Sequence, residues 1–279
     1  MVDCGLGIAD CGIARAARTI ETKRQLRMNP QSPIPNPQSK KRVHIGCSGF
    51  RSSREAYFGR LGAVEVQHTF YQPPKVETLR RWREEAPEGF VFAVKAWQVI
   101  THRASSPTYR RVKRKLTEEE AEGAGSFRPT DVVAGAWDVT RECTAALKAP
   151  AVLYQCPASF RPLPENVENL RGFFGGVSRG RLTFAWEPRG DWPRSLVKEL
   201  CEELNLWHVV DPFAERTVTP RRSYFRLHGR KGWRYKYEEG ELEELASMLP
   251  RTSASYVFFN NVHMLDDATR FVEMVEADD

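Results

Sequence analysis

From residue 43 onward, short apolar runs alternate with longer amphipathic ones. Runs of four or five residues, bounded by turn residues, predict eight buried strands: Val43–Cys47, Ala63–Val66, Phe90–Val94, Ala151–Tyr154, Leu182–Trp186, Leu206–Val210, Ser223–Leu227 and Tyr256–Phe259. Patterns typical of helices lie between most of them: Val76–Glu85, Asp131–Leu147, Glu165–Phe174, Pro193–Leu204, Glu239–Met248 and Asp266–Ala277. Because strand and helix alternate eight times, the pattern predicts a parallel sheet closed into a single (β/α)8 barrel of the TIM type.

Two connections depart from this alternation. The segment PFAERTVTPRR, residues 212–222, shows no helical pattern between the sixth and seventh strands. After the third strand comes a long insertion, His102–Pro129, with the core YRRVKRKLTEEEAEG at residues 109–123. This basic block followed by an acidic one predicts a solvated helix, and the alternative is a lid over the barrel mouth.

Residues 1–42 differ in composition from the rest of the chain. The stretch MNPQSPIPNPQSKK, residues 28–41, is rich in Pro, Gln, Ser and Asn and cannot bury a core. We therefore predict a disordered or extended N-terminal extension at 1–42, dispensable for folding, and a barrel domain at 43–279.

Composition narrows the class of protein. The length of 279 residues fits one barrel, which typically needs about 250 residues, plus a short extension. No apolar stretch is long enough to span a membrane and no secretory signal is visible, so we expect no membrane partner. Six widely spaced cysteines without a CxxC pair predict free thiols and a cytoplasmic location. The net charge of +6 is compatible with an anionic ligand or nucleic acid.

Polar side chains stand at or just beyond the ends of most predicted strands. They are Glu65, Tyr71, Lys95, His102, Gln155, Glu187, Arg189, Arg226, His228 and Asn260. Because the loops after barrel strands converge on one mouth, we expect these side chains to share one concave surface. Burying so many ionisable groups is costly unless they pair, so we also expect Glu65 to pair with Lys95, and Glu187 with Arg189 or Arg226. A purely structural plug of ion pairs is the alternative.

The residue types suggest roles. Glu65, His102, Glu187 and His228 are candidate catalytic acids and bases. Cationic clamps for an anionic substrate would be Lys95, Arg189 and Arg226, while Tyr71, Gln155 and Asn260 would orient it. We predict no cofactor, but a divalent metal stays open, since Glu65, His102, Glu187, Asp211 and His228 are acceptable ligands.

The loop HGRKGWRYKY, residues 228–237, combines glycines, basic residues and aromatic rings. In barrels, the loops after strands seven and eight often build a phosphate subsite, so Gly229 and Tyr235 join the predicted substrate-binding set. Basic residues between aromatic rings are also typical of platforms for single-stranded nucleic acid.

The same motifs carry a family resemblance. The chain resembles the YecE-like family, domain of unknown function 72, from about Val43 to Val275, in the segments IGCSGF (45–50), VEVQHTFY (64–71), FAVKAWQVITH (92–102), LYQCP (153–157), AWEPRGDW (185–192), YFRLHG (224–229) and FFNN (258–261). The resemblance implies a β/α barrel with polar strand ends, similar to endonuclease IV and sugar isomerases, and it implies no established reaction.

Two hypotheses of function follow. The first is an enzyme, of hydrolase or isomerase type, that acts on a phosphate-bearing or otherwise anionic small molecule at the C-terminal mouth of the barrel. The second is an endonuclease IV-like barrel that binds nucleic acid with little or no catalysis. Salt dependence separates them, because binding that neutralises many phosphates weakens steeply with salt.

Overall fold

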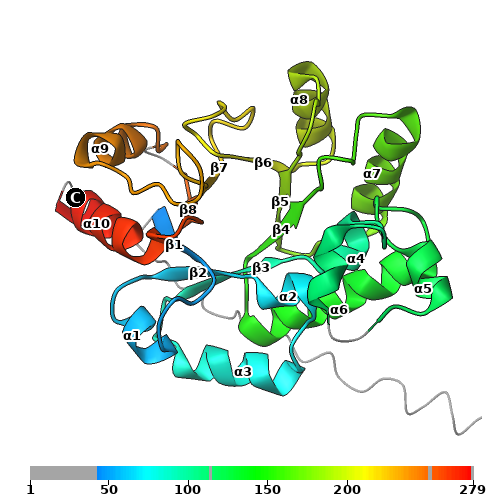
Figure 1. The fold of residues 1–279 in the computed structure, drawn as a ribbon, viewed down its shortest axis with the longest axis horizontal. Helices are drawn as coiled ribbons and strands as arrows, with labels where there is room; N and C mark the ends of the chain where they lie inside the picture. The colour runs from blue at the N-terminus through cyan, green and yellow to red at the C-terminus, as the bar shows by residue number, and fades with distance from the viewer. Residues whose placement is uncertain (1–42, 113–114, 251–252, 278–279) are drawn as a thin grey trace, which may run out of the picture. The chain divides into compact units, whose positions relative to one another are not determined.

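Eight parallel strands close into one barrel in the computed structural model, which describes residues 43–112, 115–250 and 253–277. The strands are β1 (Val43–Ser48), β2 (Ala63–Val66), β3 (Val91–Lys95), β4 (Ala151–Gln155), β5 (Thr183–Glu187), β6 (Trp207–Val210), β7 (Ser223–Leu227) and β8 (Ser255–Phe259). Each strand pairs with the next along the chain, and β8 closes the ring on β1 with Val43 opposite Ser255 (Figure 1). The predicted barrel is confirmed.

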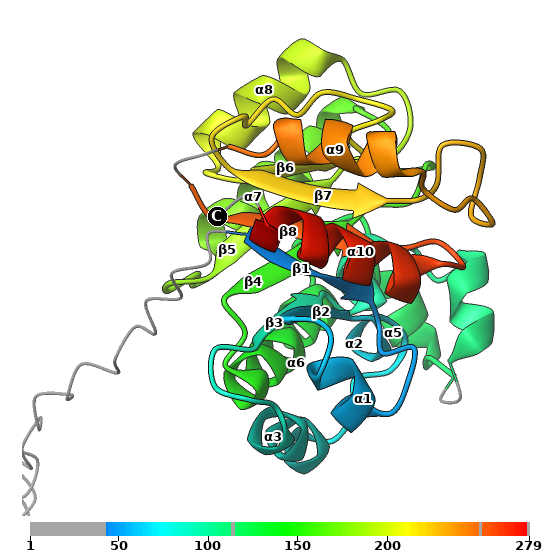
Figure 2. The ribbon, with the colours of Figure 1, turned by 90° about the vertical axis from the view of Figure 1, so that its left-hand side faces the viewer.

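Helices connect the strands and lie mostly outside the ring (Figures 1 and 2). They are α1 (Arg54–Phe58), α2 (His68–Tyr71), α3 (Val76–Glu85), α4 (Gln98–Thr101), η2 (Pro107–Arg111), α5 (Glu118–Gly123), α6 (Asp131–Leu147), α7 (Pro164–Gly176), α8 (Arg194–Glu203), α9 (Glu239–Ser247) and α10 (Met264–Ala277). As predicted, the connection from β6 to β7 contains no helix.

The insertion after β3 is not the single solvated helix that its charge pattern predicts. A short 3₁₀ helix, η2, begins after the Ser106 N-cap, and a separate helix, α5, begins at a capping box in which Thr117 and Glu120 bond reciprocally. Two local caps therefore divide the segment, and residues 113–114 between them lie outside the described part. The predicted extension at 1–42 also lies outside the described residues.

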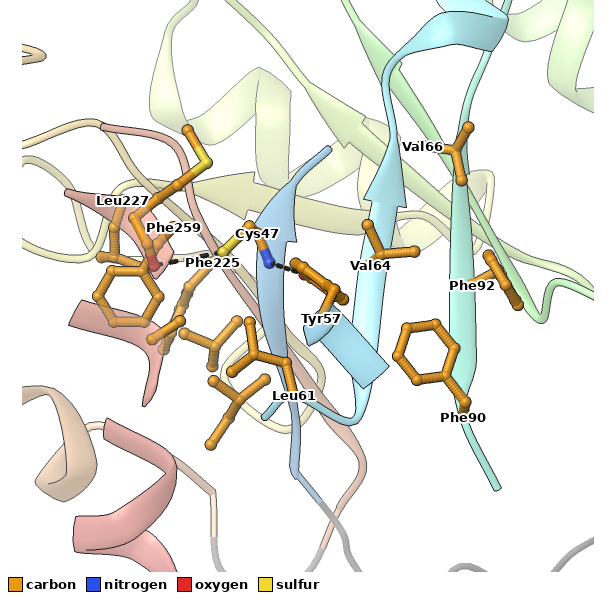
Figure 3. Close-up of a cluster of buried hydrophobic side chains, with 14 of the residues drawn as sticks. Cys47, Tyr57, Leu61, Val64, Val66, Phe90, Phe92, Phe225, Leu227 and Phe259 are labelled. Carbon is orange, nitrogen blue, oxygen red and sulfur yellow. Dashed lines mark hydrogen bonds between the residues drawn. The ribbon is translucent and has the colours of Figure 1, made fainter. Parts of the chain in front are cut away.

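An apolar layer packs between the strands and the surrounding helices, and Figure 3 shows its part around β1 and β2. The buried Tyr57 hydroxyl accepts the Cys47 N–H at 2.8 Å and donates to the Ala63 carbonyl at 2.9 Å, which ties α1 to both strands. The approach is so close that a Cβ at Gly46 would lie 2.0 Å from the Ala63 oxygen, so this position requires glycine.

Inside the barrel, side chains alternate with period two and form layers. The lower layer combines small residues on one side with large rings on the other: Ala63, Ala93, Ala151, Ala185, Tyr224 and Tyr256. Two residues further along four of these strands stand the charged side chains Glu65, Lys95, Glu187 and Arg226, all buried. The strand register therefore places a charged layer directly above an apolar floor.

The cysteines follow the prediction as far as the described residues extend. Cys47, Cys143, Cys156 and Cys201 are buried free thiols. No described helix is long and apolar enough to cross a membrane.

Candidate functional site

A cavity of about 480 Å³ lies at the carboxyl ends of the strands. Seven of the twelve side chains predicted for the site line it: Tyr71, Lys95, Gln155, Arg189, Arg226, His228 and Asn260. Two further cations, Arg51 and Arg111, complete a set of five, and no carboxylate belongs to the lining within the described part of the chain. The wall that a ligand would meet is therefore cationic.

Arg226 forms the centre of the charged layer beneath the cavity. Its guanidinium donates to Glu65 through Nε (3.0 Å to Oε2) and Nη2 (2.8 Å to Oε1), and to Glu187 Oε2 through Nη1 at 2.7 Å. The Arg226 and Glu65 side chains are 1% and 0% exposed. Burial alone would lower the pKa of Arg226, but Glu187 and Glu65 raise it above its ordinary value. The guanidinium is thus permanently charged and bridges two carboxylates.

Glu65 has no free oxygen for a substrate. Besides Arg226, it accepts the Ser48 hydroxyl at 2.9 Å and the Tyr224 hydroxyl at 2.8 Å, and the Gln67 amide also donates to it. The prediction that Glu65 pairs with Lys95 is wrong, because Arg226 reaches Glu65 from the far side of the barrel and takes both of its oxygens. Glu65 acts here as a buried counter-charge.

Glu187 is the second counter-charge, and both cations predicted for it are present. Arg189 Nη2 lies 2.7 Å from Oε1, Arg226 Nη1 lies 2.7 Å from Oε2, and the Gln155 amide donates to Oε2 at 3.0 Å. Burial by itself would raise the pKa of Glu187, but Arg226, His228 and Arg189 outweigh it and hold the pKa well below its usual range. An ionised carboxylate in this position neutralises cations and does not donate protons.

Lys95 stands apart from this network. Its Nζ donates to Gln155 Oε1 at 2.7 Å and lies 3.9 Å from the centroid of the Phe70 ring. No carboxylate of a described residue lies within ion-pair distance of it. Burial and then the charge of Arg226 lower the pKa of Lys95 to about 7. The amine is therefore available in both protonation states near neutral pH.

Arg51 and Arg111 were not among the predicted site residues. Arg111 Nη1 donates to the Tyr71 hydroxyl at 2.9 Å, and Arg51 Nε lies 3.3 Å from the Met264 sulfur, so each has a neutral partner. Arg51 directly follows the glycine turn after β1, a position that the strand-end argument could have included. Arg111 lies in the basic block of the insertion, whose path over the barrel no local pattern reveals.

His228 occupies the rim between two polar neighbours. Its Nδ1 lies 3.2 Å from Asn260 Nδ2, and its Nε2 lies 3.2 Å from Arg189 Nη2. Its backbone N–H donates to Asp211 Oδ2 at 2.8 Å, which fixes the start of the following loop. The ring is one-third exposed and lines the cavity, so it can contact a bound ligand.

These residues match one family over most of the chain. Residues 46–279 fit the model of the family described as protein of unknown function DUF72. The chain belongs to the DUF72 family. The UPF0759 protein YunF of Bacillus subtilis (strain 168) is 25% identical over 257 residues, which cover 80% of this chain and 85% of YunF.

Crystal structures of two other DUF72 family proteins share the fold. One, from Enterococcus faecalis V583, is 21% identical with a TM-score of 0.64, and the match covers 84% of this chain and 97% of that one. The other, from Thermotoga maritima MSB8, is 22% identical with a TM-score of 0.61, over 84% and 99% of the two chains. At this identity the likeness shows the barrel and not the chemistry.

His102 does not line the cavity of this DUF72 barrel. Its ring packs edge-to-face against Phe70 at 5.0 Å, and its Nδ1 lies 2.7 Å from the Thr101 hydroxyl. Burial, followed by the charge of Lys95, lowers the pKa of His102 to about 3. The imidazole is therefore neutral near pH 7 and supports Phe70 from behind, so the geometry gives it no acid–base role.

Gly229 and Tyr235 also lie outside the cavity lining. The Gly229 N–H is already donated to the Tyr237 hydroxyl at 2.9 Å, and the Gly232 N–H to the Gly229 carbonyl at 3.0 Å. Tyr235 donates its hydroxyl to Glu241 Oε1 at 2.7 Å. These donors are therefore already engaged within the loop and by α9, which a composition of glycine and basic residues could not reveal.

The residues considered for a divalent metal do not gather into a ligand set. Among the described residues, no group of three His, Cys, Asp or Glu side chains is placed to hold an ion. Glu65 and Glu187 direct their oxygens at Arg226, and Asp211 accepts backbone N–H groups of Phe213 and His228. The strongest chemical feature of the mouth is its unpaired positive charge.

Proposed function

We propose that this DUF72 barrel is an enzyme that binds a phosphate-bearing or otherwise anionic small molecule in the mouth cavity. One observation carries the proposal. Arg51, Lys95 and Arg111 line the cavity with neutral partners only, among the residues described, whereas Arg189 and Arg226 are neutralised from below by Glu187 and Glu65.

A buried structural plug would be expected to balance its own charges, because uncompensated charge in a low-dielectric site is costly. Arg226 with its two carboxylates achieves this balance, whereas the buried Lys95 has no carboxylate partner among the described residues. Arg51 and Arg111 add exposed positive charge to the same cavity. An anionic ligand supplies the missing charge, and Arg side chains suit the oxygens of phosphate and carboxylate groups.

Two groups at the wall can move protons for a reaction of the hydrolase or isomerase type. His228 and Lys95 both line the cavity, so a ligand held there by the cations can contact both. The predicted carboxylates, Glu65 and Glu187, serve instead to orient and charge-balance Arg226.

The nucleic-acid hypothesis depends on the insertion after β3 and on the 228–237 loop. Of the three rings in this loop, Trp233 is 62% exposed, whereas Tyr237 is buried and Tyr235 is hydrogen-bonded to α9. A platform that stacks successive bases needs several free rings. The cavity therefore supports a small anion better than a long polyanion.

Titration of the protein with inorganic phosphate in a calorimeter tests the proposal. Arg111→Ala and Arg51→Ala each remove an exposed cation of the wall and should weaken binding about ten-fold, as expected for a lost charge-assisted hydrogen bond of about 1.5 kcal/mol. Arg171→Ala is the matched control, because Arg171 is an exposed arginine of α7 paired with Glu199 and Glu203. Absent heat of binding in the wild type, or equal affinity in all four proteins, would overturn the proposal.

A further inference from the structure

Lys95 differs from the other lysines of the described chain. It is 5% exposed, whereas Lys75, Lys115, Lys148, Lys198, Lys231 and Lys236 are all exposed. It ends β3, lines the cavity and has no ion-pair partner among the residues described. A lysine kept only for charge balance would be expected to contact a carboxylate, as Arg226 does.

Its hydrogen bond to Gln155 has a fixed direction. The Gln155 Nε2 donates to Glu187 Oε2 at 3.0 Å, so the amide must turn its Oε1 toward Lys95, at 2.7 Å. This oxygen can accept an N–H but cannot donate into the nitrogen lone pair. The hydrogen bond therefore orients the Lys95 amine while leaving its lone pair free in the neutral form.

We propose that Lys95 forms an imine with the carbonyl carbon of a small phosphorylated or carboxylated aldehyde or ketone bound in the cavity. The lone pair of the neutral amine attacks the carbonyl carbon and forms the C–N bond. The carbonyl oxygen then leaves as water with the two amine protons, and a C=N bond remains. The inference rests on the proposed function, because the wall cations must hold the anionic group of the substrate.

The surroundings of Lys95 favour this step. Burial and the positive charge of Arg226 both disfavour the protonated form of the Lys95 amine. Desolvation and a neighbouring cation are the two means by which proteins make a lysine nucleophilic. The low pKa of Lys95 agrees with the geometry of the site, in which the amine lines the cavity and contacts no carboxylate of a described residue.

Pyridoxal 5′-phosphate, a phosphorylated aldehyde, is a suitable probe when followed by borohydride reduction and peptide mapping by mass spectrometry. With its pKa near 7, Lys95 should have a neutral fraction at pH 7 roughly a thousand-fold larger than that of an ordinary lysine of pKa about 10.4, so it should be labelled much faster. Lys95→Met should lose this label, and Lys75→Met, which removes an exposed lysine, should keep it. Melting curves of both variants establish that they are folded.

Two comparisons separate this inference from the proposed function. Excess inorganic phosphate should slow labelling of Lys95, and pyridoxal without the phosphate should label it more slowly. If Lys95 is labelled fast and neither excess phosphate nor loss of the probe's phosphate group slows the reaction, the reactive amine is supported and the anion site is contradicted. Labelling of Lys95 no faster than of Lys75, in a protein that binds phosphate in the calorimeter, would overturn the imine and leave the anion site standing.

Discussion

Arg226→Ala should destabilise the folded protein by about 3–5 kcal/mol, the typical loss when one partner of a buried ion pair is removed. The substitution leaves the fully buried Glu65 without a cation among the described residues, and it leaves Glu187 with Arg189 as its remaining arginine. Urea denaturation of the wild type and the variant measures this change in the free energy of unfolding.

Two further variants show which part of the Arg226 contribution to the free energy of unfolding comes from its hydrogen-bond geometry and which from its charge. Arg226→Lys keeps the charge, but a single nitrogen cannot reproduce the planar fork that contacts the two carboxylates through Nε, Nη1 and Nη2, so its loss should be intermediate. Arg171→Ala, which breaks only exposed pairs, should cost at most about 1 kcal/mol. An Arg226→Ala protein as stable as Arg171→Ala would contradict the central position of Arg226.

The second large effect concerns the pH dependence of stability. The pKa of Lys95 is lowered to about 7 in the folded protein, below the value of about 10.4 for an unfolded lysine. Between these values the unfolded state binds more protons than the folded state, so the contribution of Lys95 to stability grows as pH rises and is lost as pH falls toward 7.

Lys95→Met should remove this contribution. From pH 7 to pH 9, the unfolding free energy of the wild type should rise relative to that of Lys95→Met by roughly 2 kcal/mol, as the linkage between the two pKa values requires. Lys75→Met should follow the wild-type profile, since its side chain is exposed. Parallel profiles for wild type and Lys95→Met would show that the Lys95 amine keeps an ordinary pKa.

The sequence predicts the barrel well because its signal is local and repeated. Each strand is a short apolar run between turn residues, and the period of two within a strand determines which side chains face the interior. By this period Tyr224 and Arg226 share one face of β7 and Phe225 lies on the other, as in the structure.

The partners across the barrel were harder to predict. Glu65 and Lys95 stand on neighbouring strands, which favoured a pair, but the long Arg226 side chain crosses from β7 and takes both Glu65 oxygens. Which charges meet depends on side-chain length and barrel width, and strand patterns carry no information on either. Arg111 was missed for a related reason, because its insertion returns to the mouth only in three dimensions.

The sequence also could not predict which residues near the strand ends reach the cavity. His102 follows a strand end in the same way as the residues of the cavity, yet the short helix α4 carries it behind the Phe70 ring. In the 228–237 loop, the glycines and rings that resemble a phosphate subsite bond to one another. Residue type therefore identified the region of the site, and backbone path decided which side chains reach the cavity.

A crystal structure of the protein with saturating phosphate tests the central claim most directly. We expect a phosphate in the mouth cavity, with one oxygen in hydrogen-bond reach of Lys95 Nζ and another near Arg51 or Arg111. The Arg226–Glu65 pair below it should be unchanged. A cavity that holds only water at saturating phosphate, or phosphate bound solely on the 228–237 loop, would contradict it.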